Sequence, residues 1–254
     1  MSTVTALRPA DKTERGERDV RVELAACYRL IAHFGMDDLV YTHISARVPG
    51  TEHFLINPYG LMFHEITASS LVKIDWDGNV VEPTEYEVNK AGFVIHSAVH
   101  MARPEVACVL HTHTRAGVAV SCLEEGLLPL NQFSLGFYGR VAYHDYEGIA
   151  LDVDERERLV RDLGDKPAMV LRNHGLLAVG ASVPQTFQTM FYLEQSCRVQ
   201  LEVMSSGGKM VRPPKGVCEK TAAQFDKLRA ERPLTREWPA LLRLLDAKDP
   251  SYRN

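Results

Sequence analysis

The chain has 254 residues, which suits one large domain or two small ones, and its 45% hydrophobic and 24% charged residues predict a globular protein with a sizeable core. The net charge is −4, and the 29 Lys and Arg are scattered among 33 Asp and Glu without a long basic stripe, so nucleic acid is a poor candidate partner. No apolar run is long enough to span a membrane and the N-terminus has no signal-peptide core, so we expect a cytoplasmic protein without a membrane partner.

The five cysteines predict neither a disulfide framework nor a cysteine zinc site. Their number is odd, and no two of them have the C-x-x-C spacing. Each has apolar neighbours, so reduced and partly buried thiols are expected. The cysteines are Cys27, Cys108, Cys122, Cys197 and Cys218.

In chain order, the first half is predicted to combine two helices with short strands. Residues 1–18 are charged and lack hydrophobic periodicity, so we expect a flexible arm there. Apolar residues at helical spacing begin at Val20, and Gly35 is a natural end for that helix. A second helix is predicted at 90–102, because Pro104 disfavours helical geometry in the residue before it. Short strands are predicted at 42–48, 54–56 and 71–75, with turns at 57–60 and 77–79.

The second half is predicted to begin with a buried strand at 106–110. Pro184 in the first turn and the glycine pair that follows the end mark a long helix at about 184–205. Further helices are predicted at 115–125, 152–163 and 220–229, and a short buried strand at 169–171. No repeat or linker is visible, so we expect one domain over 19–207, followed by a C-terminal helical extension, 208–254, packed on it or on a neighbour.

Tight turns join several of these strands, and this excludes a purely parallel sheet. The alternation of strands with helices still indicates an α/β protein. A mixed or mainly antiparallel sheet with helices on both faces is therefore predicted.

Three histidines follow two of the buried strands. His111 and His113 come directly after the strand at 106–110, and residues i and i+2 of a strand point to the same side. His174 follows the strand at 169–171, so two strand ends in one sheet can bring three imidazoles together. Three neutral nitrogen ligands with one open position form a catalytic zinc site, and iron, manganese or cobalt also fit. An H-x-H pair alone also occurs in structural or exposed positions.

The segments around these histidines resemble the class II aldolase/adducin family. The resemblance rests on residues 111–121 (HTHTRAGVAVS), preceded by 102–106 (ARPEV), and on 172–176 (RNHGL). It runs from about Val20 to Gly207. It implies a three-layer α/β/α sandwich and a divalent metal, usually zinc, on His111, His113 and His174. It also implies retro-aldol cleavage, epimerisation or dehydration through an enediolate, and a homo-oligomer, commonly a tetramer.

The chain departs from the sugar-phosphate aldolases of that family at the acid/base position. Their glutamate falls on Gly92 here, and the nearest upstream carboxylates are Glu85 and Glu87. Either would serve if its loop curled inward, although solvated loop acids are the alternative. The family's proton-donating tyrosine falls near Gln132 or Phe133, neither of which has a phenolic hydroxyl.

The phosphate pocket of those aldolases is also largely missing. The G-N-x-S pattern becomes Thr42-His43-Ile44-Ser45, the T-P-T-G pattern becomes Asn57-Pro58-Tyr59-Gly60, and two serines become Lys90 and Ala91. Residues 89–93 and 141–148 resemble the adducin branch instead. Adducin heads are scaffolding domains of a membrane cytoskeleton, but this chain keeps all three histidines and lacks a long basic tail.

Several polar residues are candidates for lining the site. His96 and His100 share one face of a helix because they are one turn apart, which suits either a pocket or a packed interface. The predicted catalytic residues are Glu85, Glu87 and His96, and the predicted substrate-binding residues are Lys90, His43, Asn57, Arg115 and His100. Weaker candidates are His64, His144, Tyr146 and Glu194.

Three functions are compatible with these residues. The first is a metal-dependent lyase, of aldolase or decarboxylase type, that acts on a small hydroxy- or oxo-carbonyl compound or carboxylate and not on a sugar phosphate. The second is an adducin-like interaction domain with a structural or vestigial metal site. An iron-dependent oxidative enzyme is a third possibility. An open metal position would favour catalysis, and a fourth protein ligand would favour a structural role.

Overall fold

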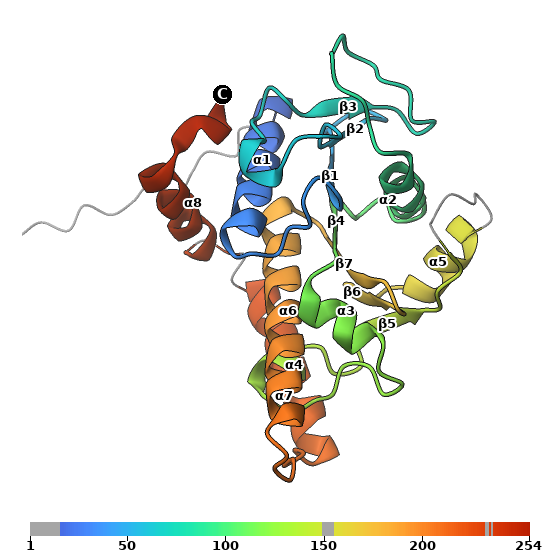
Figure 1. The fold of residues 1–254 in the computed structure, drawn as a ribbon, viewed down its shortest axis with the longest axis vertical. Coiled ribbons are helices and arrows are strands. Elements are labelled where there is room, and N and C mark those ends of the chain that lie inside the picture. The colour runs from blue at the N-terminus through green and yellow to red at the C-terminus, as the bar shows by residue number, and fades with distance from the viewer. Residues whose placement is uncertain (1–15, 149–154, 232–233, 235) are drawn as a thin grey trace, which may run out of the picture.

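A computed structural model describes residues 16–148, 155–231, 234 and 236–254 (Figure 1). The first fifteen residues, most of the predicted arm, lie outside the described residues. So do residues 149–154 and the side chains of Lys90, Ala91 and Glu155.

A seven-stranded sheet in the order β3-β2-β1-β4-β7-β6-β5 forms the middle of the molecule. Every neighbouring pair is antiparallel except β5 and β6, which are parallel. The mixed, mainly antiparallel sheet predicted from the turn-joined strands is therefore confirmed. The strands are β1 (His43–Arg47), β2 (Phe54–Ile56), β3 (Val72–Ile74), β4 (Cys108–Thr112), β5 (Val141–His144), β6 (Ala168–Leu171) and β7 (Gly175–Gly180).

Helices cover both faces of this sheet (Figure 1). Helices α1, α3 and α6 lie on one face and α2 and α5 on the other, while α7 and α8 belong to the tail. The α-helices are α1 (Glu17–His33), α2 (Lys90–Ala102), α3 (Arg115–Ser121), α4 (Gln132–Leu135), α5 (Glu155–Leu163), α6 (Val183–Ser205), α7 (Lys215–Glu231) and α8 (Glu237–Lys248). Two 3-10 turns are η1 (Phe63–Glu65) and η2 (Pro250–Arg253).

Alternating side chains of the central strands build two separate cores. In β4, Cys108 and Leu110 pack with α1 and α6, whereas Val109 packs on the opposite face. In β7, Ala178 and Val179 divide in the same way. This is the period of two that a strand buried on both faces must have, and it produces the three-layer arrangement.

Element boundaries were predicted closely where local signals are strong. Helix α2 and strand β2 begin and end where predicted, and α6 begins one residue earlier, at Val183. Strand β4 was placed two residues too early, because its pairing with β1 and β7 continues through His111 and Thr112. Helix α3 ends at Ser121 and not near residue 125. Strands β5 and β7 and helices α4 and α8 were not predicted.

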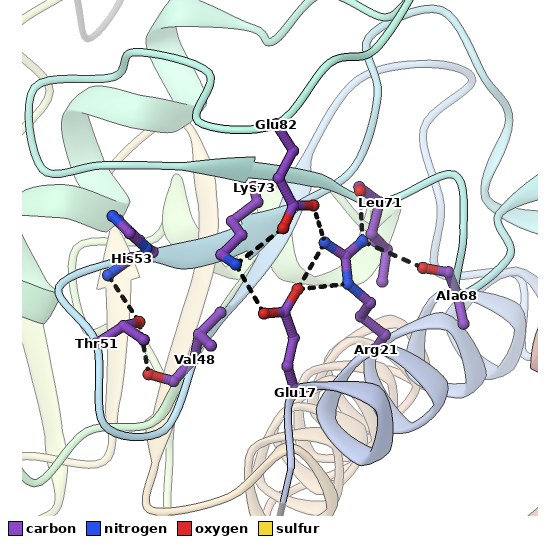
Figure 2. Close-up of polar contacts among 9 residues, drawn as sticks. All are labelled: Glu17, Arg21, Val48, Thr51, His53, Ala68, Leu71, Lys73 and Glu82. Atoms are coloured by element: carbon purple, nitrogen blue, oxygen red, sulfur yellow. Dashed lines mark hydrogen bonds and ion pairs between the residues drawn. The ribbon is translucent and has the colours of Figure 1, made fainter.

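An ion-pair network fastens α1 to the edge of the sheet (Figure 2). Arg21 pairs with Glu17 and Glu82, each at 2.7 Å, and Lys73 of β3 bridges the same two carboxylates at 2.7 and 2.9 Å. Arg21 also donates to the carbonyl oxygen of Leu71, at 2.8 Å. Helix α1 begins at Glu17, so this network starts inside the segment predicted to be an arm.

The tail packs on the same chain. Tyr252 of η2 is buried, and its carbonyl accepts a hydrogen bond from the Ala68 amide at 2.9 Å. Arg29 of α1 pairs with Asp249 at 3.1 Å. Within the described residues, no helix is both long enough and apolar enough to cross a membrane.

Candidate metal centre

The structure brings together the three histidines that were predicted as metal ligands. Nε2 of His113 lies 2.8 Å from Nε2 of His111 and 2.9 Å from Nε2 of His174. Among the described residues, their ligand atoms are close enough together to hold one metal ion, since they all lie within 4.8 Å of one another. His111 belongs to β4, His113 follows that strand, and His174 lies in the turn between β6 and β7.

The turn that carries His174 depends on an unusual backbone. Asn173 has a positive φ of 55°, and its amide donates to the carbonyl of Ser121 at 3.2 Å. Asparagine tolerates this left-handed conformation better than most residues. Gly175 follows because a Cβ there would lie 2.4 Å from the Thr112 carbonyl oxygen. The glycine therefore allows β7 to approach β4 beside the histidines.

Hydrogen bonds on the far side of two rings determine which nitrogen carries the proton. Nδ1 of His111 lies 2.9 Å from the carbonyl oxygen of Leu176, and Nδ1 of His113 lies 3.0 Å from Oδ2 of Asp38. A carbonyl or a carboxylate only accepts, so both Nδ1 atoms must be the protonated ones. In their neutral forms, both rings then carry a lone pair on Nε2.

In that neutral state, the two lone pairs face each other across 2.8 Å. This arrangement is repulsive unless a metal ion or a proton lies between the rings. Zinc bonds of about 2.0–2.1 Å in tetrahedral geometry separate the nitrogens by about 3.3 Å, so small rotations of the rings would accommodate the ion. The donor set therefore fits a divalent metal.

Two of the three rings are also kept neutral, as metal ligands must be. Burial, with the neighbouring His174 and His43, lowers the pKa of His111 well below its ordinary value. Burial, followed by the nearby His113 and His144, lowers the pKa of His174 to about 4. Both imidazoles consequently offer lone pairs at neutral pH.

Sequence reasoning missed Asp38, the residue that orients His113. It lies 75 positions earlier in the chain, in the loop between α1 and β1. Leu39 and Thr42 of this loop have positive φ values of 50° and 63°, which are rare for residues other than glycine. Such strained loops are frequent at functional sites. The sequence carries no local signal that pairs this aspartate with a histidine.

Glu194 supports the turn after His113. Its hydrogen bonds within the described residues go to other side chains and not to a histidine ring. It is buried on α6 and accepts a hydrogen bond from the Thr114 hydroxyl, while Arg198 donates to its other oxygen at 2.7 Å. The same hydroxyl accepts from the Gly117 amide at 3.2 Å and so caps α3. The carboxylate therefore fixes the start of α3 next to the candidate metal ligands.

His96 and His100 are buried behind the three histidines and do not line an open pocket. Both ring nitrogens of His96 have partners, namely His43 at 2.8 Å and the Ser45 hydroxyl at 2.6 Å. His100 contacts the same hydroxyl at 2.8 Å. Their predicted roles, direct catalysis and substrate binding, do not agree with this placement. His43, in contrast, lies next to one of the three histidines, because its ring centre is 5.1 Å from that of His111.

The remaining candidates are distributed around the site. Asn57 is buried and accepts from the Tyr28 hydroxyl at 2.8 Å, which indicates a structural role and not the predicted substrate contact. Glu85 and Glu87 are exposed in the loop before α2, as is Arg115 at the start of α3. The side chain of Lys90 lies outside the described part of the structure.

Of the weaker candidates, two lie beside His174. The ring of Tyr146 is 6.2 Å from that of His174, and both residues line a narrow pocket with His144. His144 is buried, with Nδ1 at 2.8 Å from Oδ2 of Asp162. His64 is exposed on η1, away from this pocket.

Comparison with known proteins agrees with this geometry. Residues 22–201 match the model of the class II aldolase and adducin N-terminal domain. A Pseudomonas aeruginosa protein provisionally named as a class 2 aldolase is 50% identical, with both chains fully covered. Rattus norvegicus alpha-adducin is 44% identical over 82% of this chain and 29% of its own length. The structure of L-fuculose 1-phosphate aldolase from Glaciozyma antarctica superposes with a TM-score of 0.82 at 30% identity, over 98% of this chain and 97% of the other.

Proposed function

We propose a metal-dependent lyase activity for this chain, which belongs to the class II aldolase and adducin family. The substrate would be a small hydroxy- or oxo-carbonyl compound or carboxylate. The metal would be zinc, with iron, manganese and cobalt as chemically acceptable alternatives. The observation that carries the proposal is the convergence of the Nε2 atoms of His111, His113 and His174 on one point, which a metal ion would occupy.

The side chains of the site would have different roles. His111, His113 and His174 would hold the metal, and Asp38 would keep the His113 ring in the correct tautomer. When bound, the metal would supply a Lewis acid that polarises a substrate carbonyl and stabilises an enolate. Within the described residues, the metal-binding group contains three ligands and no fourth. That leaves a coordination position for substrate, which supports a catalytic role.

The choice of substrate class rests on what the site lacks. Gly92 stands where the sugar-phosphate aldolases resembled by this sequence carry a glutamate, and an added Cβ there would lie 2.5 Å from Cδ2 of His43. That space cannot hold a glutamate side chain. Asn57, in one of the segments corresponding to their phosphate pocket, is bonded to Tyr28. We therefore propose an unphosphorylated substrate, whose carboxylate would meet Arg115 or Lys90.

An interaction domain without enzymatic activity is the second candidate. The 44% identity with alpha-adducin over 82% of this chain favours it. In that case the histidines would hold a structural ion or none. We further propose, from the family resemblance alone, that the chain assembles as a homotetramer. Light scattering at micromolar concentration would test this, and a monomer would refute it.

A substrate panel distinguishes the two candidates. Purified protein is loaded separately with zinc, manganese and iron, and is assayed on 2-hydroxy and 2-oxo acids beside fuculose and ribulose phosphates. We expect turnover of an acid and negligible cleavage of the sugar phosphates, because a missing acid/base group costs about 10²–10⁴ in rate. Efficient cleavage of a sugar phosphate would overturn the substrate assignment. Inactivity with every metal and substrate would favour the interaction domain.

A further inference from the structure

A buried chain of polar side chains leads away from the three histidines between β1 and α2. His43 and Ser45 lie on the same face of the strand, and His96 and His100 on the same face of the helix. Nδ1 of His43 is 2.8 Å from Nε2 of His96, whose Nδ1 is 2.6 Å from the Ser45 hydroxyl. That hydroxyl is 2.8 Å from Nε2 of His100, and Nδ1 of His100 is 3.3 Å from the Val106 carbonyl.

The hydrogen bond between His100 and Val106 determines the donor and the acceptor in every other hydrogen bond of this series. The carbonyl of Val106 only accepts, so Nδ1 of His100 carries a proton and its Nε2 accepts from Ser45. The hydroxyl has a single hydrogen atom, so it must accept from Nδ1 of His96. Nε2 of His96 is then an acceptor for Nδ1 of His43. Every donor in the chain is thereby fixed, and His43 is left with an unprotonated Nε2.

Neutral imidazoles are required for this argument, and the environment provides them. All three rings are buried. Burial, with the charge of Arg47 nearby, lowers the pKa of His100 to about 3. Burial also lowers the pKa of His96 well below its ordinary value. Neither ring therefore acquires a second proton at neutral pH.

The free edge of His43 occupies the space above Gly92. A Cβ at that glycine would lie 2.5 Å from Cδ2 and 3.1 Å from Nε2 of His43, so no side chain fits there. The His43 ring is also stacked obliquely against His111, with ring centres 5.1 Å apart and a tilt of 32°. In the part of the chain that the structure describes, no hydrogen bond involves Nε2 of His43. This nitrogen is thus an acceptor without a protein donor, beside the candidate metal ligands.

We propose that Ser45, His96 and His100 are positioning residues that hold His43 in the Nδ1-protonated tautomer, so that its Nε2 accepts a hydrogen bond from a substrate hydroxyl group. The inference rests on the proposed function, because it assumes a small ligand at the three histidines. It adds a selectivity to that function. A ligand with a hydroxyl group beside its carboxylate satisfies the acceptor, whereas an oxo acid leaves it unpaired.

The direction of the chain can be measured without a substrate. Long-range proton–nitrogen correlation spectra of the ¹⁵N-histidine-labelled protein distinguish protonated from unprotonated ring nitrogens, with each histidine assigned by its own substitution. In the chelator-treated wild-type protein we expect a protonated Nδ1 and an unprotonated Nε2 on His43, His96 and His100. A protonated Nε2 on His43 would overturn the proposal. The spectrum that decides this is recorded on the wild-type protein, and the variants serve only to assign its signals.

The variant Ser45→Ala tests whether the hydrogen-bonded series of side chains affects ligand binding. The matched control is Ser196→Ala, which removes another buried hydroxyl, bonded to the Tyr192 carbonyl at 2.7 Å. We measure the binding of glycolate and of pyruvate to the zinc-loaded proteins by calorimetry. Ser45→Ala should bind glycolate about threefold to tenfold more weakly, with pyruvate unchanged, and Ser45→Thr should restore binding. The control should match the wild type for both acids.

The outcomes separate the two proposals. Equal losses for glycolate and pyruvate in Ser45→Ala would show a structural role and would overturn the positioning role. A wild-type protein that holds zinc and binds neither acid would overturn the proposed substrate class and the hydroxyl contact with it. The wild-type spectrum would still decide whether the chain fixes the tautomer of His43.

Discussion

At the scale of single residues, the candidate site depends on atoms that do not face the metal position. The carbonyl of Leu176 and the carboxylate of Asp38 accept the Nδ1 protons of His111 and His113, so that the Nε2 atoms of both rings face the metal position. A histidine ring without such a partner could adopt either tautomer. The three histidines could be recognised in the sequence as candidate ligands because they lie at the ends of buried strands, but their partners could not. Asp38 reaches His113 only through the strained loop before β1.

Asp38→Asn should weaken zinc binding about 10- to 100-fold, because an amide is a poorer acceptor for the His113 Nδ1 proton than a carboxylate. The measurement is a competition titration against a zinc chelator of known affinity. Asp37→Asn is the matched control, since it makes the same change one residue away and should leave the affinity unaltered. Equal affinities in the two variants would show that Asp38 does not orient the ligand.

At the scale of elements, helix α2 and strand β1 pack closely because a glycine and a histidine are complementary. Gly92 could be recognised in the sequence as a missing glutamate, but not as the place where the His43 ring lies. The bounds of α2 were predicted because its apolar spacing and Pro104 are local signals. The bounds of β4 were not predicted correctly, because pairing with two other strands extends β4 through His111. Local patterns thus specified helices better than they specified contacts between elements.

Gly92→Ala should lower the free energy of unfolding by about 1–3 kcal/mol, because its Cβ would force the His43 ring out of place. Urea unfolding followed by circular dichroism provides the value. Gly216→Ala in α7, where a Cβ would meet nothing within 4 Å, should be neutral or stabilising by up to about 1 kcal/mol. The cost should shrink in a His43→Ala background, and an undiminished cost there would contradict the proposed clash.

At the scale of the whole molecule, the sheet joins the candidate metal centre to a buried polar layer. The predicted α/β fold with a mixed sheet is confirmed, and so is membership of the family. Strand β7 escaped prediction because its apolar run lies between two glycines directly after the histidine turn. The burial of His96 and His100 was not predicted, because their helical spacing is compatible with both a pocket and a packed interface.

The buried histidines should make the fold sensitive to acid. In the unfolded chain they bind protons below about pH 6.5. In the folded protein, burial keeps the pKa of His100 at about 3 and holds those of His43 and His96 well below normal. The unfolded state therefore binds more protons, and stability should fall between about pH 6.5 and pH 3, by up to about 1.4 kcal/mol per pH unit for each histidine.

Urea unfolding at several pH values, with chelator present to remove metal effects, measures this slope. His100→Gln should reduce the slope below pH 6 by up to about 1.4 kcal/mol per pH unit, because it removes one titrating group. His64→Gln, a change at an exposed histidine, is the control and should leave the slope unchanged. A His100→Gln slope equal to that of the wild type would disprove the assignment.

The central claim is that His111, His113 and His174 together bind one divalent metal ion. Elemental analysis of the purified wild-type protein and of the three single alanine variants tests it most directly, with His64→Ala as the exposed control. We predict about one metal ion per chain in the wild type and in His64→Ala, and loss of most of it in each of the other variants. Unchanged metal content in the three single variants would contradict the account.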